Sequence, residues 1–394
     1  MTDRLALDAV GEEVDVAVIG AGPAGIAAAL LVRREGLSVA LVAPRTVPGD
    51  HRTVAMLGVS VDILRQTGIW PALAETASPM RAMRIIDGTR RLVRAPPVEF
   101  HAREIEREVF GYNIPNAALL AALEDAAAAS GLLRIEGLAR TISRGAAGVT
   151  IDAGGAGRVT ARLVGAADGR HSPTREVAGI PVRRWSYPQT AIVATIRHEL
   201  PHDDVSTEFH TESGPFTLVP LPGRRSAIVC VVKPAEGERL MALSDAEIAR
   251  LFEEKSHAIV GGITIEGSRQ SFPLVGQRAA CFARARIALI GEAAHVFPPI
   301  GAQGLNLSLR DAAVFARIAA AHRADPGAPD ALAAYDASRS GDIVTRTAAV
   351  DMLNRTLLTD MLPVQMARGL GLFALDRMPA LKRIAMRQAL APHL

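Results

Sequence analysis

The stretch "VDVAVIGAGPAGIAAALLVRREGLSVALVAPR", residues 14–45, decides the fold of this 394-residue chain. Its first six residues are mostly apolar and β-branched, which predicts a buried strand. A glycine-rich turn follows, and the alanine- and leucine-rich run behind it predicts a helix that ends near Glu35. A second apolar run, from Ser38 to Val42, predicts another strand. The order strand, helix, strand predicts a βαβ unit with parallel strands.

The glycines of this stretch follow the spacing G-x-G-x-x-G where the first strand passes into the helix, as Gly20, Gly22 and Gly25. In a dinucleotide-binding unit the first glycine makes the tight turn and the second lets the backbone approach a pyrophosphate at the helix N-terminus. The third allows close packing of helix and strand. The motif alone is weak evidence, but its place inside a βαβ unit favours a nucleotide site over a turn without a ligand.

The end of the second strand departs from that pattern. An acidic residue is expected there to hold the ribose hydroxyls, but the chain has Ala43, followed by Pro44 and Arg45. A missing acid with a nearby arginine also suits NADP, whose extra phosphate an arginine can bind. This segment by itself leaves the nucleotide open.

A second segment, "LVGAADGRHSPTREVAGI" at residues 163–180, predicts a strand that ends in a turn at Asp168 and Gly169. Ser172 can then cap a helix that begins at Pro173. Taken alone, this segment reads as one more connection between a strand and a helix.

A third segment, "ARIALIGEAAHVFPPIGAQGLNLSLRDA" at residues 285–312, predicts a strand over 287–290 that enters Gly291 and Glu292. A proline-glycine loop then leads into a helix near Gly304. Amides at that helix N-terminus can stabilise an anion, which fits the negative charge of a reduced flavin's pyrimidine ring. The carboxylate of Glu292 could accept hydrogen bonds from a sugar-alcohol chain.

The order of these motifs resembles that of the single-component FAD-dependent aromatic hydroxylases, and within them the UbiH/UbiF-type ubiquinone-biosynthesis hydroxylases. The resemblance rests further on "DHRTVAML" at 50–57, "YPQTAIVATIRHELPH" at 187–202, "GPFTLVPLPGRRSAIV" at 214–229 and "PIGAQGLNLSLRDA" at 299–312. Together these segments span most of the chain.

The resemblance implies which residues contact the FAD: Gly20, Gly22, Gly25, Arg52, Asp168, Gly169, Gly291, Glu292, Pro298, Gly301, Gln303, Gly304, Leu305 and Asn306. The first motif would carry the pyrophosphate, and Arg52 would reach the cofactor from the loop after the second strand. The Asp168 motif is associated with both FAD and NAD(P)H binding, and Gly291 and Glu292 would hold the ribityl chain. The segment 298–306 would border the isoalloxazine ring. Glu292 replaces the usual aspartate, and Ala43 loses a hydrogen bond worth about 1 kcal/mol.

The resemblance also implies the architecture, an α/β fold with a Rossmann-like FAD-binding domain, an inserted β-sheet substrate domain and a helical C-terminus. The FAD-binding domain would comprise residues 1–75, 101–180 and 281–330. The substrate domain would comprise residues 76–100 and 181–280, where strand patterns alternate with turn signals such as "PLPGRR". Residues 331–394 would form the helical C-terminal region.

The implied reaction is hydroxylation of the aromatic ring of a prenylated phenol in ubiquinone biosynthesis. NADPH or NADH would reduce the FAD, and dioxygen would add to give a flavin hydroperoxide that transfers its distal oxygen. Alternatives are a hydroxylase of a small soluble aromatic compound, which would need a buried arginine for a carboxylate, and a non-catalytic FAD-binding assembly subunit. The sequence names no catalytic residue, since His295 suits a hydrogen bond within its own loop equally well.

One further pattern, H-E-x-x-H from His198 to His202, has the spelling of a zinc site. The motif works on a helix, but Pro201 and the β-branched run before it predict a strand end and a turn. In an extended strand, residues four apart are separated by roughly 13 Å, too far for one metal ion. We therefore expect no metal.

Composition supports a globular chain, with 49% hydrophobic and 22% charged residues. A net charge of only +3 gives no overall field for nucleic acid, so no nucleic-acid partner is expected. Two distant cysteines and the lack of a signal peptide or membrane span predict a cytoplasmic protein.

Positive charge gathers near the C-terminus, where "DRMPALKRIAMRQALAPHL" predicts a basic amphipathic helix. Its apolar residues at helical spacing are Met378, Leu381, Ile384 and Ala385, and its basic residues are Arg377, Lys382, Arg383 and Arg387. Such a helix offers peripheral contact with the inner face of the membrane, or with other ubiquinone-biosynthesis proteins. The plainer interpretation is a terminal helix packed on its own domain.

Overall fold

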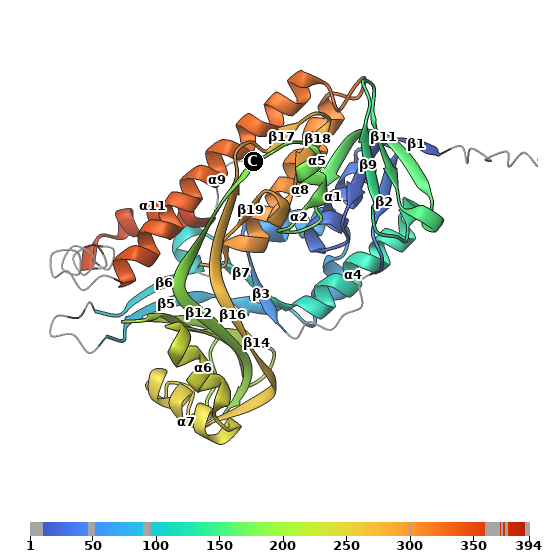
Figure 1. The fold of residues 1–394 in the computed structure, drawn as a ribbon. Coiled ribbons are helices and arrows are strands. Elements are labelled where there is room, and N and C mark those ends of the chain that lie inside the picture. Colours follow the sequence, from blue (N-terminus) through green and yellow to red (C-terminus); the bar gives the residue numbers. More distant parts are fainter. Residues whose placement is uncertain are drawn as a thin grey trace, which may run out of the picture.

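The computed structural model describes residues 11–45, 52–89, 94, 96–298, 301–358, 371, 373–374 and 377–390. Residues 299 and 300 of the predicted flavin-bordering segment lie outside this part. Two large sheets lie toward the two ends of the molecule, and the long strands β12 (Val182–His198) and β16 (Ile263–Ala279) of the second sheet extend toward the first (Figure 1).

The first sheet has a parallel centre, as expected for a nucleotide-binding fold. Its strands are, in spatial order, β17 (Ala283–Arg284), β18 (Ile287–Leu289), β11 (Arg158–Ala166), β1 (Glu12–Ile19), β2 (Val39–Val42) and β8 (Leu133–Ile135). In addition, β10 (Val149–Asp152) pairs with β11, and β9 (Thr141–Arg144) pairs with β10. The five strands from β18 to β8 are parallel to one another. The predicted βαβ unit is confirmed, since α1 (Pro23–Arg34) connects β1 to β2.

Helices pack on this sheet through a continuous apolar core. Their bounds are α1 as above, α4 (Asn116–Ala129), α5 (Pro173–Val177) and α8 (Gln303–Ala321). Ile26 of α1, Leu123 of α4 and Phe315 of α8 are buried in this core. Ser172 caps α5 as predicted, because its hydroxyl accepts a hydrogen bond from the Arg175 amide at 2.9 Å and Pro173 is the first helical residue.

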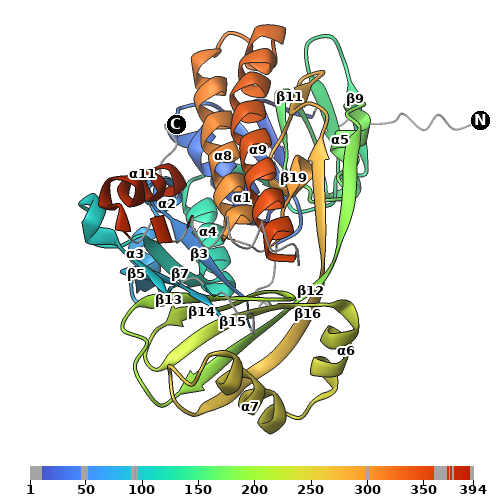
Figure 2. The same cartoon turned by 90° about the vertical axis from the view of Figure 1, so that its left-hand side faces the viewer.

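The second sheet is mainly antiparallel. Its spatial order is β19 (His295–Val296), β16, β12, β15 (Arg225–Val232), β14 (Gly214–Leu221), β13 (Val205–Thr211), β5 (Ala82–Asp87) and β6 (Val98–His101). Helices α6 (Pro234–Ala242) and α7 (Asp245–Lys255) cover one face, where Phe216 and Ile228 pack with Phe252 (Figure 2). The other face carries a small apolar cluster with Ala191 and Val231.

A three-stranded sheet and the remaining helices complete the fold. The strands are β3 (Thr53–Leu57), β7 (Gly111–Pro115) and β4 (Ser78–Met80), and the helices are α2 (Val59–Gln66), α3 (Trp70–Leu73), α9 (Pro329–Leu358) and α11 (Pro379–Leu390). The predicted helical C-terminus is confirmed, and α9 lies beside α8 (Figure 2). Among the described residues, none of the helices is both long and apolar enough to cross a membrane.

The H-E-x-x-H pattern lies at the end of β12, as expected, but the predicted separation of its histidines is wrong. The rings of His198 and His202 are 5.7 Å apart, because the chain turns after His198 instead of remaining extended. Each ring nitrogen has a protein partner: His198 contacts the Leu200 carbonyl at 2.8 Å and the Ser226 hydroxyl at 3.0 Å. His202 contacts the Leu221 carbonyl at 2.9 Å and accepts from the Asp204 amide at 3.1 Å. The described residues hold no group of three or more His, Cys, Asp or Glu placed for a metal ion.

Candidate functional site

The register of the parallel sheet brings the three sequence motifs to one edge. Ile19 of β1 pairs with Ala166 of β11, and Ala166 pairs with Leu289 of β18. Because parallel strands end at the same edge, the turns that follow them lie side by side. The Gly20 motif, the Asp168 motif and the Gly291 motif, separated by more than a hundred residues in sequence, therefore meet at the carboxyl edge of the sheet, where ligands bind in such folds.

The three glycines of the first motif have different surroundings. Gly20 has φ +111°, and a Cβ there would lie 2.2 Å from the Ala167 carbonyl oxygen. A Cβ on Gly25 would lie 2.0 Å from the Gly20 carbonyl oxygen. A Cβ on Gly22 would meet no atom within 4 Å. Gly20 and Gly25 are thus required by the fold itself, whereas Gly22 keeps open the space in front of the helix N-terminus.

Asp168 lies beside this turn. One of its carboxylate oxygens is hydrogen-bonded within the protein, and the other has no partner among the described residues. Its Oδ2 accepts hydrogen bonds from the Thr174 amide at 3.1 Å and the Thr174 hydroxyl at 2.7 Å. Its Oδ1 is buried and has no hydrogen-bond partner among the described residues. Since a buried acceptor without a donor is costly, this oxygen suits a ligand hydroxyl. The neighbouring Gly169 has φ +85°, which the turn requires.

Arg175 joins the second motif to the third, a role that the sequence reasoning missed although the residue belongs to the quoted motif. The side chain is 1% exposed. Its Nη1 donates to the Ala293 carbonyl at 2.8 Å and its Nη2 to the Arg170 carbonyl at 3.1 Å. Burial lowers the pKa of this guanidinium, and the neighbouring Arg184 adds to the effect. The arginine in the spacing D-G-x-x-S-x-x-R was the available signal.

The third motif begins in a short 3₁₀ helix, η3 (Gly291–Ala293), after β18. Gly291 has φ +63°, and its amide donates to Asp311 Oδ2 at 2.9 Å. Glu292 is exposed, and its carboxylate lies 3.5 Å from the Arg170 guanidinium. The Glu292 side chain thus faces the second motif across the strand ends.

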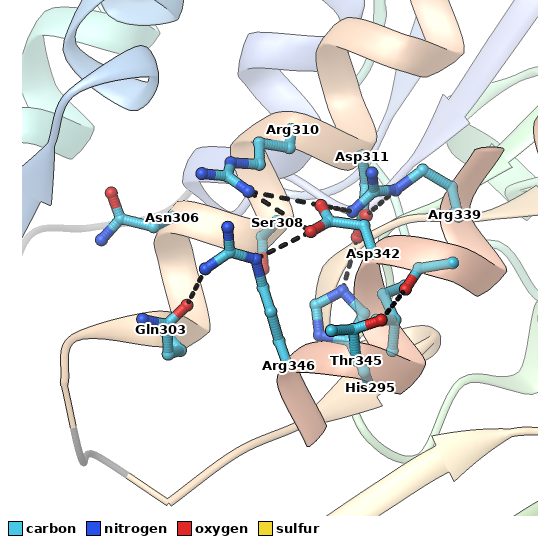
Figure 3. A network of polar contacts seen from close by, with 12 residues as sticks. His295, Gln303, Asn306, Ser308, Arg310, Asp311, Arg339, Asp342, Thr345 and Arg346 are labelled. Atoms are coloured by element: carbon cyan, nitrogen blue, oxygen red, sulfur yellow. Dashed lines mark hydrogen bonds and ion pairs between the residues drawn. The ribbon is translucent and has the colours of Figure 1, made fainter. Parts of the chain in front are cut away.

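Asp311 of α8 is the centre of a buried polar network (Figure 3). Its Oδ2 contacts His295 Nε2 at 2.7 Å, and its Oδ1 accepts from Arg339 Nε of α9 at 2.7 Å. Burial alone would raise the pKa of Asp311, but the charges of His295 and Arg339 and the Gly291 amide outweigh it and hold the pKa below 3.8. No motif in the sequence pointed to Arg339, which lies in the C-terminal helical region.

The start of α8 forms the other side of this edge. Ala302 precedes the helix with φ +54° and no side chain caps the first turn. Gln303 is partly exposed, and its Nε2 donates to the Gly301 carbonyl at 3.0 Å. Gly304 is exposed with no atom within 4 Å of a Cβ position, while Pro298 is buried and Leu305 packs against the core.

Asn306 connects this helix to the three-stranded sheet. Its Oδ1 accepts from the Leu57 amide at 2.9 Å, and its Nδ2 donates to the Ala55 carbonyl at 2.7 Å and the Ala302 carbonyl at 2.6 Å. All its amide atoms are thus engaged with the protein. Asn306 positions the loop that begins α8 instead of presenting free polar atoms.

Arg52 links the two halves of the molecule. The side chain is exposed, and its guanidinium carbon lies 5.1 Å from the centre of the Phe272 ring on β16. Phe272 pairs with Ala191 of β12, so both lie on the face of the second sheet opposite to α6 and α7. That face is therefore the one turned toward the candidate site.

At the end of β2, where an acid that binds ribose was expected, the structure has Ala43, as the sequence indicated. Ala43 follows β2, and its amide donates to the Ile135 carbonyl at 3.1 Å. The Arg45 guanidinium lies 2.7 Å from the carboxylate of Glu136, which follows β8. This pairing engages the arginine that the sequence offered for an NADP phosphate.

These features fit a dinucleotide. The open space at Gly22, the uncapped start of α8 and the free Oδ1 of Asp168 provide room for phosphate, a helix N-terminus and an acceptor for a hydroxyl. The Gly22 turn and Asp168 follow β1 and β11 at one sheet edge, and α8, which follows β18 in the chain, contacts α1 and η3.

Comparisons with known proteins agree with this geometry. The profile of the FAD-binding-domain family matches residues 13–348. The chain is 35% identical to the ubiquinone hydroxylase UbiL of Rhodospirillum rubrum over 392 residues, covering 95% of this chain and 89% of that one. It is 28% identical to 3-demethoxyubiquinol 3-hydroxylase of Escherichia coli over 396 residues, covering 96% and 99% of the two chains.

Solved structures share the fold at lower identity. The p-nitrophenol 4-monooxygenase PnpA from Pseudomonas putida DLL-E4 has a TM-score of 0.78 at 18% identity, covering 97% of this chain and 100% of that one. HpxO of Klebsiella pneumoniae, in complex with FAD and uric acid, has a TM-score of 0.76 at 19% identity, covering 95% and 97%.

Proposed function

Because the chain belongs to the family of FAD-dependent aromatic-ring hydroxylases, we propose that it hydroxylates the aromatic ring of a polyprenylated phenol in ubiquinone biosynthesis. The observation that carries the proposal is the 35% identity to a ubiquinone hydroxylase over 95% of this chain. Bound FAD would supply the activation of dioxygen, with electrons from NADPH or NADH. The protein's own task is to bind the cofactor, position the ring and exclude water.

We propose that the FAD lies along the carboxyl edge of the parallel sheet. The pyrophosphate would lie at Gly20, Gly22 and Gly25, the ribityl chain near Asp168, Gly169, Gly291 and Glu292, and the isoalloxazine against Pro298, Gly301, Gln303, Gly304, Leu305 and Asn306, with Arg52 opposite. The free Oδ1 of Asp168 supports the ribityl position. The exposure of Glu292 and its contact with Arg170 favour a solvent-side role for that carboxylate.

The division into domains stays a proposal with the bounds predicted above. Residues 1–75, 101–180 and 281–330 would bind FAD, residues 76–100 and 181–280 would bind substrate, and residues 331–394 would support both. It is supported by the pairing of β5 and β6 with strands of the second sheet. The contact of Arg52 with Phe272 marks where the two parts meet.

The face of the second sheet that Arg52 approaches favours an apolar substrate. It carries Ala191, Val231 and Leu274, with Tyr187 and Val229 beside them. The arginines buried in the described part of the chain, namely Arg175, Arg310 and Arg339, all belong to the parallel-sheet half or its packed helices. Each is hydrogen-bonded within the protein. A soluble aromatic acid would want such an arginine on the substrate face, so this distribution supports the prenylated phenol.

The test is mass analysis of quinone precursors in a strain that lacks this gene. We expect a precursor short of one hydroxyl to accumulate and the wild-type chain to remove it. The purified protein should be yellow and release FAD on denaturation. Bound FAD that NAD(P)H cannot reduce with any candidate phenol would instead support the non-catalytic assembly subunit.

We also propose that α11 meets an anionic membrane surface, since a prenylated phenol partitions into lipid. Met378, Leu381 and Ile384 are 54%, 40% and 54% exposed, with Arg383 and Arg387 exposed beside them. Basic residues near an anionic surface contribute about 1 kcal/mol each. The opposite side of the helix is anchored, because Met386 is buried against Ala102, Ile105 and Phe110.

Because α11 packs on the rest of the protein, the membrane contact is tested with point substitutions and not with a truncation. Lys382, which the sequence grouped with the exposed charges, forms an ion pair with Glu104 at 2.9 Å, so truncation would remove internal contacts. A double variant, Leu381→Ser with Ile384→Ser, keeps those contacts and should reduce binding to phosphatidylglycerol vesicles several-fold. Leu138→Ser, at a 70% exposed leucine elsewhere, is the matched control. Unchanged vesicle binding by the double variant would refute the membrane contact.

A further inference from the structure

A buried cluster of charges lies between α8 and α9, next to the loop that begins α8 (Figure 3). Asp311 and Asp342 are its acidic members, and Arg310, Arg339 and Arg346 are its basic members. Asp342 accepts from Arg339 Nη2 at 3.0 Å and from Arg346 Nε at 2.7 Å, and lies 3.4 Å from Arg310 Nη1. Three guanidiniums face two carboxylates, so these five side chains together carry one excess positive charge.

The three arginine side chains of this cluster are largely buried. The side chains of Arg310, Arg339 and Arg346 are 7%, 3% and 15% exposed. Burial lowers the pKa of Arg310 to about 10, and the charge of Arg346 adds to this effect while Asp342 opposes it. Salt screens a buried charge weakly, so its field reaches neighbouring groups.

Arg346 connects this cluster to the predicted isoalloxazine loop. Its Nε bonds Asp342, and its Nη1 donates to Gln303 Oε1 at 3.1 Å. Gln303 in turn donates from Nε2 to the Gly301 carbonyl at 3.0 Å. A planar guanidinium can hold both partners at once in fixed geometry, whereas an ammonium group cannot. A residue of the C-terminal helical region thereby fixes the first turn of α8 and the loop before it.

We propose that Arg346 is a positioning residue for the flavin: through Gln303 it orders the loop at Gly301, and its charge favours the reduced, anionic flavin over the oxidised one. The inference rests on the proposed function, because it needs FAD at the start of α8. A cation close to the uncapped N-terminus of α8 adds to the positive end of that helix. Of the residues that Arg346 hydrogen-bonds in the described part of the chain, Asp342 and Gln303, only Gln303 belongs to the predicted FAD-binding set.

The variant Arg346→Met tests both parts of the proposal. It should fold, because Asp342 keeps Arg339 and Arg310 as partners, and circular dichroism checks this. We expect the preference for reduced over oxidised FAD to fall about tenfold, which lowers the midpoint potential by about 30 mV for a two-electron couple. Amide exchange over residues 301–305, measured without FAD, should become faster. Arg317→Met, which removes an exposed arginine from the same helix α8, should change neither.

Two further variants separate charge from geometry. Arg346→Lys keeps the charge but not the double contact, so it should restore the potential while exchange stays fast. If Arg346 acts through Gln303, adding Gln303→Leu to Arg346→Met should accelerate exchange no further than either single change.

The outcomes are distinct. Bound FAD with unaltered potential and unaltered loop exchange in Arg346→Met would overturn the inference. A lowered potential that lysine does not restore would overturn the role of the charge. A wild-type protein that binds no FAD would refute the proposed function instead, and the exchange measurement would still decide whether Arg346 orders the loop.

Discussion

The turn at Gly20–Gly25 and the return segment from Gly291 to Asp311 meet at one sheet edge but are held there differently. The first is shaped by backbone alone, since Cβ atoms on Gly20 and Gly25 would lie 2.2 and 2.0 Å from carbonyl oxygens. The second is held by a buried carboxylate that binds the Gly291 amide, His295 and Arg339 of a different helix. The difference teaches that the first half of the site is limited by backbone packing at Gly20 and Gly25, while the second depends on a charge contributed from the C-terminal region.

The largest effect should come from adding one methyl group where backbone packs on backbone. Gly25→Ala would bring a Cβ within 2.0 Å of the Gly20 oxygen, so α1 could not pack on β1, and the protein should fail to fold. Gly22→Ala, in the same turn with no atom within 4 Å, is the matched control and should keep the fold. Thermal melting followed by circular dichroism compares the two. A Gly25→Ala protein that melts like wild type would contradict the steric account.

Removing the charge at the centre of the return segment should have the next largest effect. Asp311→Asn breaks one of the two ion pairs of the buried Arg339 and leaves it paired with Asp342, so we expect a loss of up to about 3–5 kcal/mol, the typical cost of breaking a buried ion pair. Asp62→Asn, which breaks an exposed pair with Arg65, is the control. Chemical denaturation measures both changes, and equal losses would contradict the central role of Asp311.

The pH dependence of this effect follows from the lowered pKa of Asp311. A carboxyl group whose pKa is lower in the folded state stabilises the protein fully above its unfolded pKa, near 3.8, and loses that effect as the pH falls through the folded value. The contribution of the Asp311 carboxylate to the difference in stability between wild type and Asp311→Asn should therefore shrink below about pH 4. A difference that grows in acid would contradict the assignment.

Local sequence patterns predicted the glycine turn at Gly20–Gly25, but they did not predict the ion pairs that hold the segment from Gly291 to Asp311. Spacing placed Gly20, Gly22 and Gly25 in the turn between β1 and α1, because such a turn is formed by residues adjacent in sequence. The carbonyl that excludes a side chain at Gly20 belongs to Ala167, after the distant strand β11. The cap at Ser172 was likewise predictable from its immediate neighbours. The link from Asp311 to Arg339 depends on how α8 packs against α9, and no local pattern encodes that packing.

Turns limited the prediction in a similar way. His198 and His202 were expected far apart on an extended strand, but the chain reverses after β12 and brings their rings to 5.7 Å. Lys382 was expected on an exposed face, but the docking of α11 turns it toward Glu104. In both cases the predicted secondary structure was confirmed, but the contacts between side chains depended on how the chain folds in three dimensions.

A substitution that leaves both halves folded should isolate cofactor binding. Gly22→Asp places a carboxylate where the open space would receive the pyrophosphate, so we expect FAD affinity to fall at least about 100-fold, or about 2.8 kcal/mol. The fold should be retained, because nothing lies within 4 Å of the new Cβ. Flavin fluorescence titration gives the dissociation constant, with Gly22→Ala as control. Wild-type affinity in the Gly22→Asp protein would mean that this turn does not bind the cofactor.

The smallest effect should come from restoring the acid that the first motif lacks. Ala43→Asp places a carboxylate at the end of β2, next to the Gly20 turn, where a ribose hydroxyl would be bound. A gained hydrogen bond of about 1 kcal/mol should tighten FAD binding about fivefold. FMN, which lacks the adenosine part, should bind equally to both proteins and serves as the control ligand. Unchanged FAD affinity would mean that another group already accepts from the ribose. Glu136 is a candidate for that group, because it follows β8, the neighbour of β2, and contacts Arg45 at 2.7 Å.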